Sequence, residues 1–486
     1  MEVLSVASEA YPLIKTGGLA DVVGALPAAL APHGVSMRVL MPGYPKVMEA
    51  LAGGREVWYF SNFFGGEARL IAGRAGGLDV IAVDAPHLYN RPGNPYVNSA
   101  GVDWPDNAQR FAALSFAAYE LARGTVEGYQ PQILHCHDWQ AALVPAYNIY
   151  NAPTPAKTVL TVHNIAFQGR FGWDVFNSLK LDYRSANEGA IEYFGGIGYL
   201  KAGLTCADAI TTVSPTYANE IRTPAFGMGL EGLLQVRADK VHGILNGIDD
   251  LAWDPMKDAA LPQTFGAASI PQRAVNKDAL CGRFGIEPGS GPLFAVVSRL
   301  TWQKGLDMMV PLIDEMVARG ATLLVLGSGD PEIENGFKAA ASRHPGKVGV
   351  EIGYDEALSH LIQAGADVMV VPSRFEPCGL TQLYGLRYGC VPLVSRVGGL
   401  ADTVIDANEA AVEAGVATGV VFAPATADAF AEGIRRTIAL YERPKVWHKM
   451  QRRGMKSDVS WELSAKKYAD LYADILGLER DADTDD

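Results

Sequence analysis

The segment from Met1 to Pro42 decides the fold class: MEVLSVASEAYPLIKTGGLADVVGALPAALAPHGVSMRVLMP. It opens with a short apolar run, Val3 to Ala7, which has the length of a strand, and a second strand-like run follows at 35–42. A Gly-rich loop and a stretch with helical spacing lie between the two runs. This order of strand, loop, helix and strand predicts a parallel α/β unit.

The same pattern continues along the chain in two series. Strand-like runs of the first series lie at 79–86, 132–138, 158–164 and 209–214, and those of the second series at 292–300, 321–329, 348–354, 368–373 and 391–399. Helical patterns separate them. We therefore predict two doubly wound, Rossmann-like α/β domains that face a deep inter-domain cleft, with ligands bound beyond the carboxyl ends of the strands.

Turn residues indicate where the two series separate. The stretch NGIDDLAWDP at 246–255 contains Asn-Gly, Asp and Pro signals, and we interpret it as a hinge linker. The predicted boundaries are 1–245 for the first domain, 256–455 for the second domain, and 456–486 for a C-terminal helix that crosses back to the first domain. The charged tail ERDADTDD is expected to fray, and we discount its Asp-x-Asp triplet as a metal site.

Composition excludes several classes of protein. A chain of 486 residues is too long for a single compact core, which predicts two domains. The content of 49% hydrophobic and 20% charged residues argues against disorder. The net charge of −13 argues against a general binder of nucleic acid or of anionic membranes. Five scattered cysteines without a Cys-x-x-Cys pair fit a reduced compartment. The N-terminal residues lack the basic leader of a signal peptide, and we expect a cytoplasmic protein.

Two Gly-containing loops precede predicted helices and are candidate anion sites. In KTGGLADV, Gly17 and Gly18 would let a ligand approach the positive helix N-terminus, with Lys15 adding a charge. A tight turn between strand and helix explains this loop equally well. In EPCGLTQ, which starts at Glu376, a carboxylate that could accept sugar hydroxyls precedes Gly and Thr at a helix start. Here a simple N-cap arrangement is the alternative.

Other polar groups follow predicted strands. Arg299 and Lys304 in SRLTWQKG could neutralise a diphosphate leaving group, although exposed basic residues are often only solvated. The clusters His137-Asp138-Trp139-Gln140 and Thr161-Val162-His163-Asn164 could bind a sugar through polar edges and an aromatic face, or could simply cap the next helix.

Taken together, the motifs resemble a known family. KTGGLADV, HDWQ, TVHNIAFQG, VSPTYANEI, NGID, SRLTWQKG, GSGD and EPCGLTQLYGLRYG occur in this order and span nearly the whole chain. The ordered set strongly resembles the bacterial glycogen synthase and plant starch synthase family of retaining, two-domain (GT-B type) glycosyltransferases. The resemblance implies ADP-glucose as donor and the non-reducing end of an α-1,4-glucan, such as glycogen or a maltooligosaccharide, as acceptor. It also implies that 1–245 is the acceptor-side domain and 256–455 the nucleotide-sugar domain.

The resemblance also implies roles for individual residues. The implied catalytic residues are His163 at the reacting face, Arg299 and Lys304 on the diphosphate, and Glu376. The implied donor-binding residues are Lys15, Gly17, Gly18, Tyr354 near the adenine, Cys378, Gly379, Leu380 and Thr381. The implied second contacts are Glu9, Asp21, Asp138, Trp139, Asn164 and Asn246. Related retaining transferases often carry a second Glu after the one matched by Glu376, but here that position is Tyr384.

The mechanism and its rivals follow from these implications. With no carboxylate nucleophile singled out, front-face attack is favoured, in which the departing phosphate takes the acceptor's proton. Neither a metal nor another cofactor is expected, because cations and backbone amides would stabilise the leaving group. The rival functions are a glucan phosphorylase, which would need lysine-bound pyridoxal phosphate and a longer chain, a transferase that uses UDP-glucose or another acceptor, and a non-catalytic glucan-binding protein.

Overall fold

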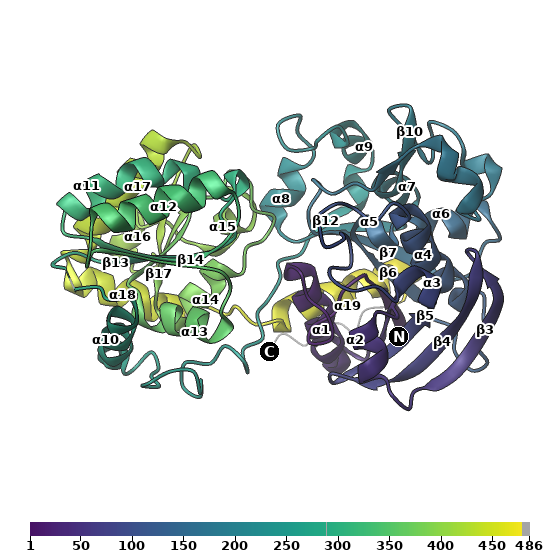
Figure 1. The fold of residues 1–486 in the computed structure, drawn as a ribbon, viewed down its shortest axis with the longest axis horizontal. Coiled ribbons are helices and arrows are strands. Elements are labelled where there is room, and N and C mark those ends of the chain that lie inside the picture. Colours follow the sequence, from purple (N-terminus) through teal and green to yellow (C-terminus); the bar gives the residue numbers. More distant parts are fainter. Residues whose placement is uncertain (288, 479–486) are drawn as a thin grey trace. The chain divides into compact units, whose positions relative to one another are not determined.

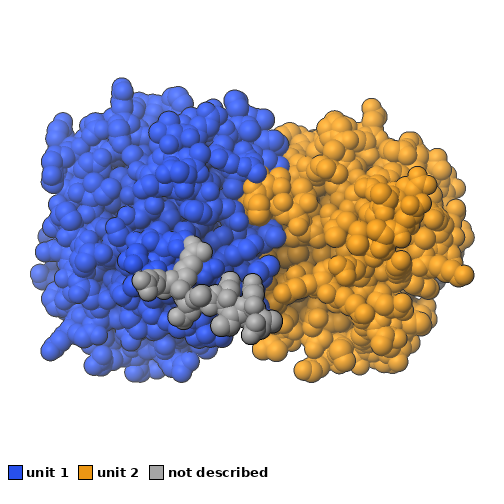
Figure 2. All heavy atoms as spheres, turned by 180° about the vertical axis from the view of Figure 1, so that it is seen from behind, with its two compact units in different colours: residues 1–213, 218–245, 461–486 blue, residues 214–217, 246–460 orange. Residues whose placement is uncertain are grey.

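The computed structural model describes residues 1–287 and 289–478, and these form two compact units. Unit 1 comprises Met1–Val213, Ala218–Leu245 and Trp461–Asp486, and unit 2 comprises Ser214–Tyr217 and Asn246–Ser460 (Figure 2). The predicted frayed tail at 479–486, with its Asp-x-Asp triplet, lies outside the described residues. By these ranges, the C-terminal helix α19 (Glu462–Leu476) belongs to unit 1, and the predicted linker at 246–255 belongs to unit 2.

Unit 1 is built on a nine-stranded sheet in the order β12-β11-β7-β6-β1-β2-β5-β4-β3. Its strands are β1 (Glu2–Val6), β2 (Ser36–Pro42), β3 (Arg55–Phe63), β4 (Gly66–Ala75), β5 (Leu78–Asp84), β6 (Ile133–His137), β7 (Lys157–Val162), β11 (Ala209–Thr212) and β12 (Val241–Gly243). β1 pairs in parallel with both β2 and β6, so that Val3 lies opposite Met37 on one side and Ile133 on the other. Among the described strands of this sheet, the antiparallel pairings are those of β4 with its two neighbours, β3 and β5.

Helices and a small second sheet complete unit 1 (Figure 1). The helices are α1 (Gly18–Leu30), α2 (Pro45–Ala50), α3 (Pro86–Tyr89), α4 (Asn107–Ala122), α5 (Asp138–Ala141), α6 (Leu143–Tyr150), α7 (Tyr199–Cys206), α9 (Glu231–Val236) and α19, while α8 (Pro215–Glu220) spans the division of the units. The three-stranded sheet is β8 (Arg170–Phe171), β10 (Gly196–Gly198) and β9 (Glu192–Tyr193). α1 buries Val22 and Leu26 against α19, where Tyr468 and Tyr472 belong to the same apolar cluster.

Unit 2 is built on a six-stranded, fully parallel sheet in the order β15-β14-β13-β16-β17-β18. Its strands are β13 (Leu293–Val297), β14 (Thr322–Gly327), β15 (Val348–Ile352), β16 (Val368–Val371), β17 (Val391–Ser395) and β18 (Val420–Phe422). Side chains alternate between the two faces of a strand. Phe294 and Val296 accordingly join one core cluster and Leu293 and Ala295 the other, so both faces of the sheet are buried.

Helices cover both faces of the unit 2 sheet (Figure 1). They are α10 (Arg273–Phe284), α11 (Ile313–Ala318), α12 (Pro331–Arg343), α13 (Glu356–Gly365), α14 (Thr381–Tyr388), α15 (Gly398–Thr403), α16 (Glu409–Ala414), α17 (Ala427–Tyr441) and α18 (Pro444–Met455). α11, α12 and α17 contribute to one core cluster, and α10 and α13 to the other. The predicted fold class, two doubly wound α/β domains, is confirmed.

Residues 246–255 pack closely on unit 2. The indole of Trp253 stacks between the rings of His360 and Tyr384, with ring centroids 3.7 Å away on each side. The backbone N–H of Ile248 donates to the carbonyl of Val459 at 2.8 Å. Besides its turn residues, this segment therefore contains a tryptophan whose buried side chain holds it on unit 2, and the composition of the segment did not indicate this.

Candidate functional site

The polar residues predicted in unit 1 follow three neighbouring strands, β1, β6 and β7. From β1 the chain moves to β2 on one side of the sheet, whereas β6 begins the other half on the opposite side. Strands β1 and β6 thus form a topological switch point, where the loops at the carboxyl edge diverge and leave room for a ligand. The loop that contains Glu9, Lys15 and Gly17 follows β1, and Asp138 follows β6.

Glu9 fastens the loop that follows β1. Its buried carboxylate accepts hydrogen bonds from the backbone N–H of Thr16, from the Thr16 hydroxyl at 2.7 Å and from the Tyr96 hydroxyl. Both carboxylate oxygens therefore have partners within the protein. The structure gives Glu9 the role of holding the loop in place, which the sequence could not show because Tyr96 is distant in the chain.

The start of α1 leaves open space around two glycines. Gly17 is the N-cap in extended conformation, no side chain caps the helix, and a Cβ added at Gly17 or Gly18 would meet no atom within 4 Å. Neither a left-handed backbone nor close packing requires glycine at these positions. Lys15 donates to Asp21 in the first turn of α1 at 2.8 Å, so its charge is balanced locally. An anion at this helix end would be held by free backbone N–H groups.

Asp138 links the ends of β6 and β7. It has a positive φ of 54°, a conformation rare for residues other than glycine, and its carboxylate accepts the backbone N–H of His163 at 2.7 Å. Burial raises the pKa of Asp138 to about 7, and the backbone hydrogen bonds from His163 and Asn164 oppose this shift only in part. Burial likewise lowers the pKa of His163 to about 3, so its imidazole is neutral at physiological pH.

Trp139 is largely committed to packing. Its ring lies 5.0 Å from Phe111 in an edge-on contact, and it also contacts Phe171 and Tyr199. A Cβ at Gly169 would come within 2.4 Å of the indole, so the backbone there closes over the ring. The predicted second contact at Trp139 is thus mainly a support for the loop that carries Asp138.

In unit 2 the predicted residues again follow strands at a switch point. β13 pairs with β14 on one side and β16 on the other, and the chain builds the two halves of the sheet outward from this pair. Arg299 and Lys304 follow β13, and the loop from Glu376 to Thr381 follows β16. The structure therefore brings these two motifs to adjacent strand ends, as expected for a ligand site of a doubly wound sheet.

Lys304 and Glu376 form an ion pair that sequence analysis did not foresee. Lys304 Nζ donates to Glu376 Oε2 at 2.5 Å, and Ser373 Oγ donates to the same oxygen at 2.8 Å. The side chains are only 18% and 7% exposed. Gly305 holds this turn against the next strand end with φ of 69°, since a Cβ there would lie 2.0 Å from the Pro372 carbonyl. Lys304 is thus not an isolated cation.

The side chain of Arg299, unlike that of Lys304, is not held by an ion pair within the described residues. Its side chain is exposed, and within residues 1–287 and 289–478 it makes no hydrogen bond or ion pair through its guanidinium. The neighbouring Arg374, in contrast, is fixed by both carboxylate oxygens of Asp307 at 2.7 Å and lies over the Trp302 ring. Arg299 therefore keeps its hydrogen-bond donors available for an anion.

The loop before α14 is held rigidly. Gly379 has φ of 73°, and Gln382 donates to the carbonyls of Cys378 and Gly379 at 3.0 and 2.9 Å. Gly399 lies against this loop, because a Cβ there would be 2.2 Å from the Cys378 carbonyl. Thr381 is the first residue of α14, whose N-terminus has no side-chain cap. Burial raises the pKa of the Cys378 thiol to about 12, consistent with a packing role.

Three further predicted residues have distinct surroundings. Tyr354, just beyond β15, is 70% exposed. Asn246 is buried, and its Oδ1 has no hydrogen-bond partner among the residues that the structure describes. Leu380 lies half-buried at the N-cap of α14.

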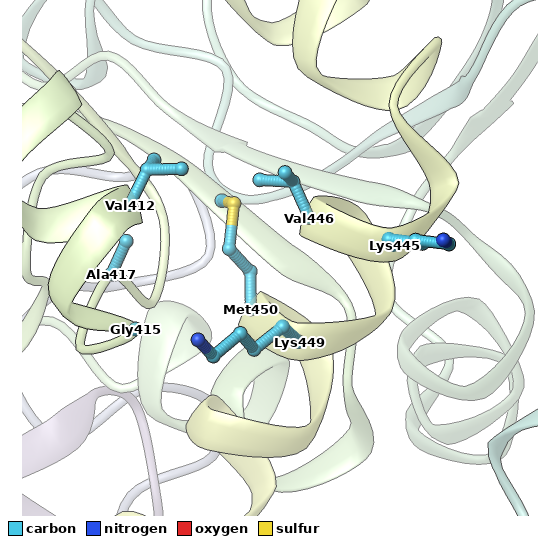
Figure 3. A pocket seen from close by; sticks show the side chains of 7 residues that line it. All are labelled: Val412, Gly415, Ala417, Lys445, Val446, Lys449 and Met450. Carbon is cyan, nitrogen blue, oxygen red and sulfur yellow. The ribbon is translucent and has the colours of Figure 1, made fainter.

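A separate small cavity lies in unit 2, between α16 and α18 (Figure 3). It has a volume of about 180 Å³, and its lining comprises Val412, Gly415, Ala417, Lys445, Val446, Lys449 and Met450. None of the predicted site residues lines it. Over the described part of the chain, no helix is long and apolar enough to cross a membrane, and no group of three or more His, Cys, Asp or Glu side chains is arranged to hold a metal ion.

Comparison with known families matches most of the chain. Residues 2–236 match the family described as starch synthase catalytic domain, and residues 284–454 match glycosyl transferases group 1. The glycogen synthase of Rhodopseudomonas palustris strain HaA2 is 56% identical over 474 residues, which cover 97% of this chain and 98% of that protein. The glycogen synthase of Novosphingobium aromaticivorans is 56% identical over 483 residues, covering 99% and 100% respectively.

Solved structures show the same similarity. The catalytic domain of starch synthase IV from Arabidopsis thaliana, bound to ADP and acarbose, superimposes with a TM-score of 0.85 at 31% identity and covers 98% of this chain and 99% of that one. A sucrose-phosphate synthase from Thermosynechococcus elongatus shares the fold, with a TM-score of 0.60 at 18% identity over 98% and 99% of the two chains.

Proposed function

Because the chain belongs to the glycogen synthase and starch synthase family of glycosyltransferases, we propose that it transfers glucose from ADP-glucose to the non-reducing end of an α-1,4-glucan with retention of configuration. The similar starch synthase of Arabidopsis is described with ADP and acarbose bound, which supports an adenine nucleotide and an α-glucan as ligands of this chain as well.

The observation that carries this proposal is the grouping of charged and polar residues at the β13 and β16 strand ends. A nucleotide-sugar transferase must stabilise the diphosphate that leaves when the glycosidic bond breaks. The available guanidinium of Arg299, the ammonium of Lys304 and the uncapped N-terminus of α14 at Thr381 supply positive charge and N–H donors for this task.

Lys304 can serve this purpose while it is paired with Glu376. An ammonium has three donors, and the contact with Glu376 Oε2 uses one of them. The carboxylate then fixes the direction of the other two N–H bonds. Glu376 itself retains Oε1 as an acceptor for sugar hydroxyls, since both hydrogen bonds that its carboxylate makes within the described residues are at Oε2.

The remaining donor contacts follow from their surroundings. Gly379 and the backbone from Cys378 to Leu380 would approach the glucose and its phosphate closely, and the exposed ring of Tyr354 offers a stacking surface for the adenine. Asn246, whose buried side chain lies beside this loop, is a proposed second contact of the site.

In unit 1, the proposed contacts lie at the β1 and β6 switch point. Gly17, Gly18 and Lys15 at the N-terminus of α1 would bind phosphate or glucose oxygens. His163 would lie at the reacting face, with Asp138 and Asn164 holding the end of β7. Asp21 would act through its ion pair with Lys15.

Retention is proposed to proceed by front-face attack. The acceptor hydroxyl would approach from the side on which the diphosphate leaves, and the departing phosphate would take its proton. We further propose that transfer needs no metal or other cofactor, because Arg299, Lys304 and helix N-termini act on the leaving group.

Stereochemistry tests this proposal. Proton NMR during the reaction of maltotriose with ADP-glucose should show a new α-anomeric signal, and β-amylase should release the added residues as maltose. A β-linked product would refute retention, and a product extended at the reducing end would refute the assigned acceptor position.

A further inference from the structure

Two chains of hydrogen-bonded side chains run through the buried interior of unit 1 behind His163. In the first, Ser5 Oγ lies 3.1 Å from His137 Nε2, and His137 Nδ1 lies 3.0 Å from His163 Nε2. In the second, the Tyr472 hydroxyl lies 2.7 Å from His135 Nδ1. The rings of His135 and His137 are 4.3 Å apart, so the two chains run side by side.

The buried hydroxyl of Ser5 decides which group donates and which accepts in each hydrogen bond of the first chain. Ser5 is fully buried, and within the described residues its hydroxyl has His137 Nε2 as its sole hydrogen-bond partner. A buried hydroxyl proton without an acceptor is costly, so Ser5 donates and His137 Nε2 accepts.

His137 then carries its single ring proton on Nδ1 and donates it to His163 Nε2. Burial lowers the pKa of both His137 and His163, which keeps both rings neutral with one ring proton each. His163 must therefore carry its proton on Nδ1. The orientation of a donor at His163 is thus set by Ser5, which is far from His163 in sequence but reaches His137 because β1 pairs with β6.

We propose that His137 is a positioning residue which, together with Ser5, holds His163 in the Nδ1–H tautomer and so makes it a hydrogen-bond donor on the side away from His137. This inference rests on the proposed function for the role of His163 toward a substrate oxygen. His163 Nδ1 has no partner among the described residues, so its N–H is available for that contact.

The second chain provides a matched comparison. His135 is buried next to His137, and burial lowers its pKa to about 3, but its ring nitrogens contact Tyr472 and, at 2.6 Å, Thr161. It makes no hydrogen bond to His163 within the described chain. Removing the Tyr472 hydroxyl should therefore disturb the interior and the docking of α19 without changing the tautomer of His163.

The test combines NMR and kinetics on the full chain. Histidine labelled with ¹⁵N allows two-bond correlation spectra to identify the protonated ring nitrogen of each imidazole, and loss of one set of signals in His163→Asn assigns His163. We expect the Nδ1–H tautomer in the wild type. Thermal unfolding checks that every variant is folded.

Paired substitutions separate positioning from packing. In His137→Asn the amide nitrogen takes the place of Nδ1 and can still donate to His163. In His137→Gln the amide nitrogen takes the place of Nε2 and cannot donate to His163. In Ser5→Ala and His137→Gln we expect His163 to lose the single Nδ1–H tautomer and kcat/KM to fall about tenfold. In His137→Asn and Tyr472→Phe we expect His163 to keep this tautomer and kcat/KM to stay within about threefold of the wild-type value.

Specific outcomes would overturn the inference. An Nε2–H tautomer in the wild type, or an unchanged tautomer in both Ser5→Ala and His137→Gln, would contradict the assigned chain. Tautomer loss without any loss of activity would contradict its role in the reaction. If the wild type does not use ADP-glucose, the proposed function fails, but the NMR result still decides the tautomer because it needs no substrate.

Discussion

Replacing Lys304 or Arg299 by alanine should separate the ion pair in unit 2 from the stabilisation of the leaving group. Both cations are proposed to act on the diphosphate, and losing one such interaction typically lowers the rate by ~10²–10³. Of the two, Lys304 alone has a side-chain partner among the described residues, Glu376, at 2.5 Å. The two variants should therefore behave alike in turnover and differently in stability.

The expected difference in stability between the two variants follows from the burial of the Lys304–Glu376 ion pair. Lys304→Ala leaves the Glu376 carboxylate, 7% exposed, with the Ser373 hydroxyl as its remaining donor among the described residues. Removing one member of a buried ion pair costs about 3–5 kcal/mol, and the partial exposure of Lys304 favours the lower end. For a unit of this size, about 3 kcal/mol corresponds to a decrease in Tm of roughly 6–12 °C. Arg299→Ala, at an exposed site whose guanidinium has no partner within the described part of the chain, should change stability by about 0.5 kcal/mol or less.

A second substitution provides the control. In Lys304→Ala combined with Glu376→Gln no charge is left buried, so most of the lost Tm should return while turnover stays low. Calorimetry measures Tm, and ADP release in the presence of glycogen measures turnover. Wild-type turnover in Arg299→Ala would refute the leaving-group role, and an unchanged Tm in Lys304→Ala would refute the ion-pair argument.

Three further predictions concern metal, backbone and thiol. EDTA should leave transferase activity intact, and a loss that added metal reverses would refute the proposal. Gly17→Ala should fold normally and weaken donor binding, whereas Gly24→Ala should destabilise unit 1 because its Cβ would lie 2.4 Å from the Tyr11 carbonyl; equal Tm values for the two variants would contradict this. Because burial raises the pKa of Cys378 from 9.0 to about 12, its thiolate fraction at pH 8 is about a thousandfold below that of an ordinary thiol, and mass spectrometry should show very slow alkylation that speeds up as pH rises.

The parallel α/β architecture could be predicted because its strands are short apolar runs separated by helical patterns. The strands β13 and β16 lie within the expected ranges, and β1 begins and ends one residue before the run predicted from Val3 to Ala7. The antiparallel strands β3 and β4 were missed, although Gly65 and Gly66 separate two strand-like runs there. Mixed polar and aromatic residues on an exposed edge carry a weaker periodic signal than a buried parallel strand.

The contacts within the candidate site depend on topology. Strand ends indicate which residues face a ligand, and Arg299 and Glu376 were predicted as site residues in this way. The pairing of Lys304 with Glu376 requires that β13 and β16 be neighbours, which no local pattern specifies. The burial of Trp253 between two rings, in a segment rich in turn residues, likewise arises from tertiary packing.

The most direct test of the central claim is incorporation of labelled glucose into glycogen by the purified protein, measured in parallel with ADP-glucose and UDP-glucose. We expect rapid incorporation from ADP-glucose, far slower incorporation from UDP-glucose, and strong loss of incorporation in Arg299→Ala. No incorporation from ADP-glucose, or equal incorporation from both donors, would contradict it.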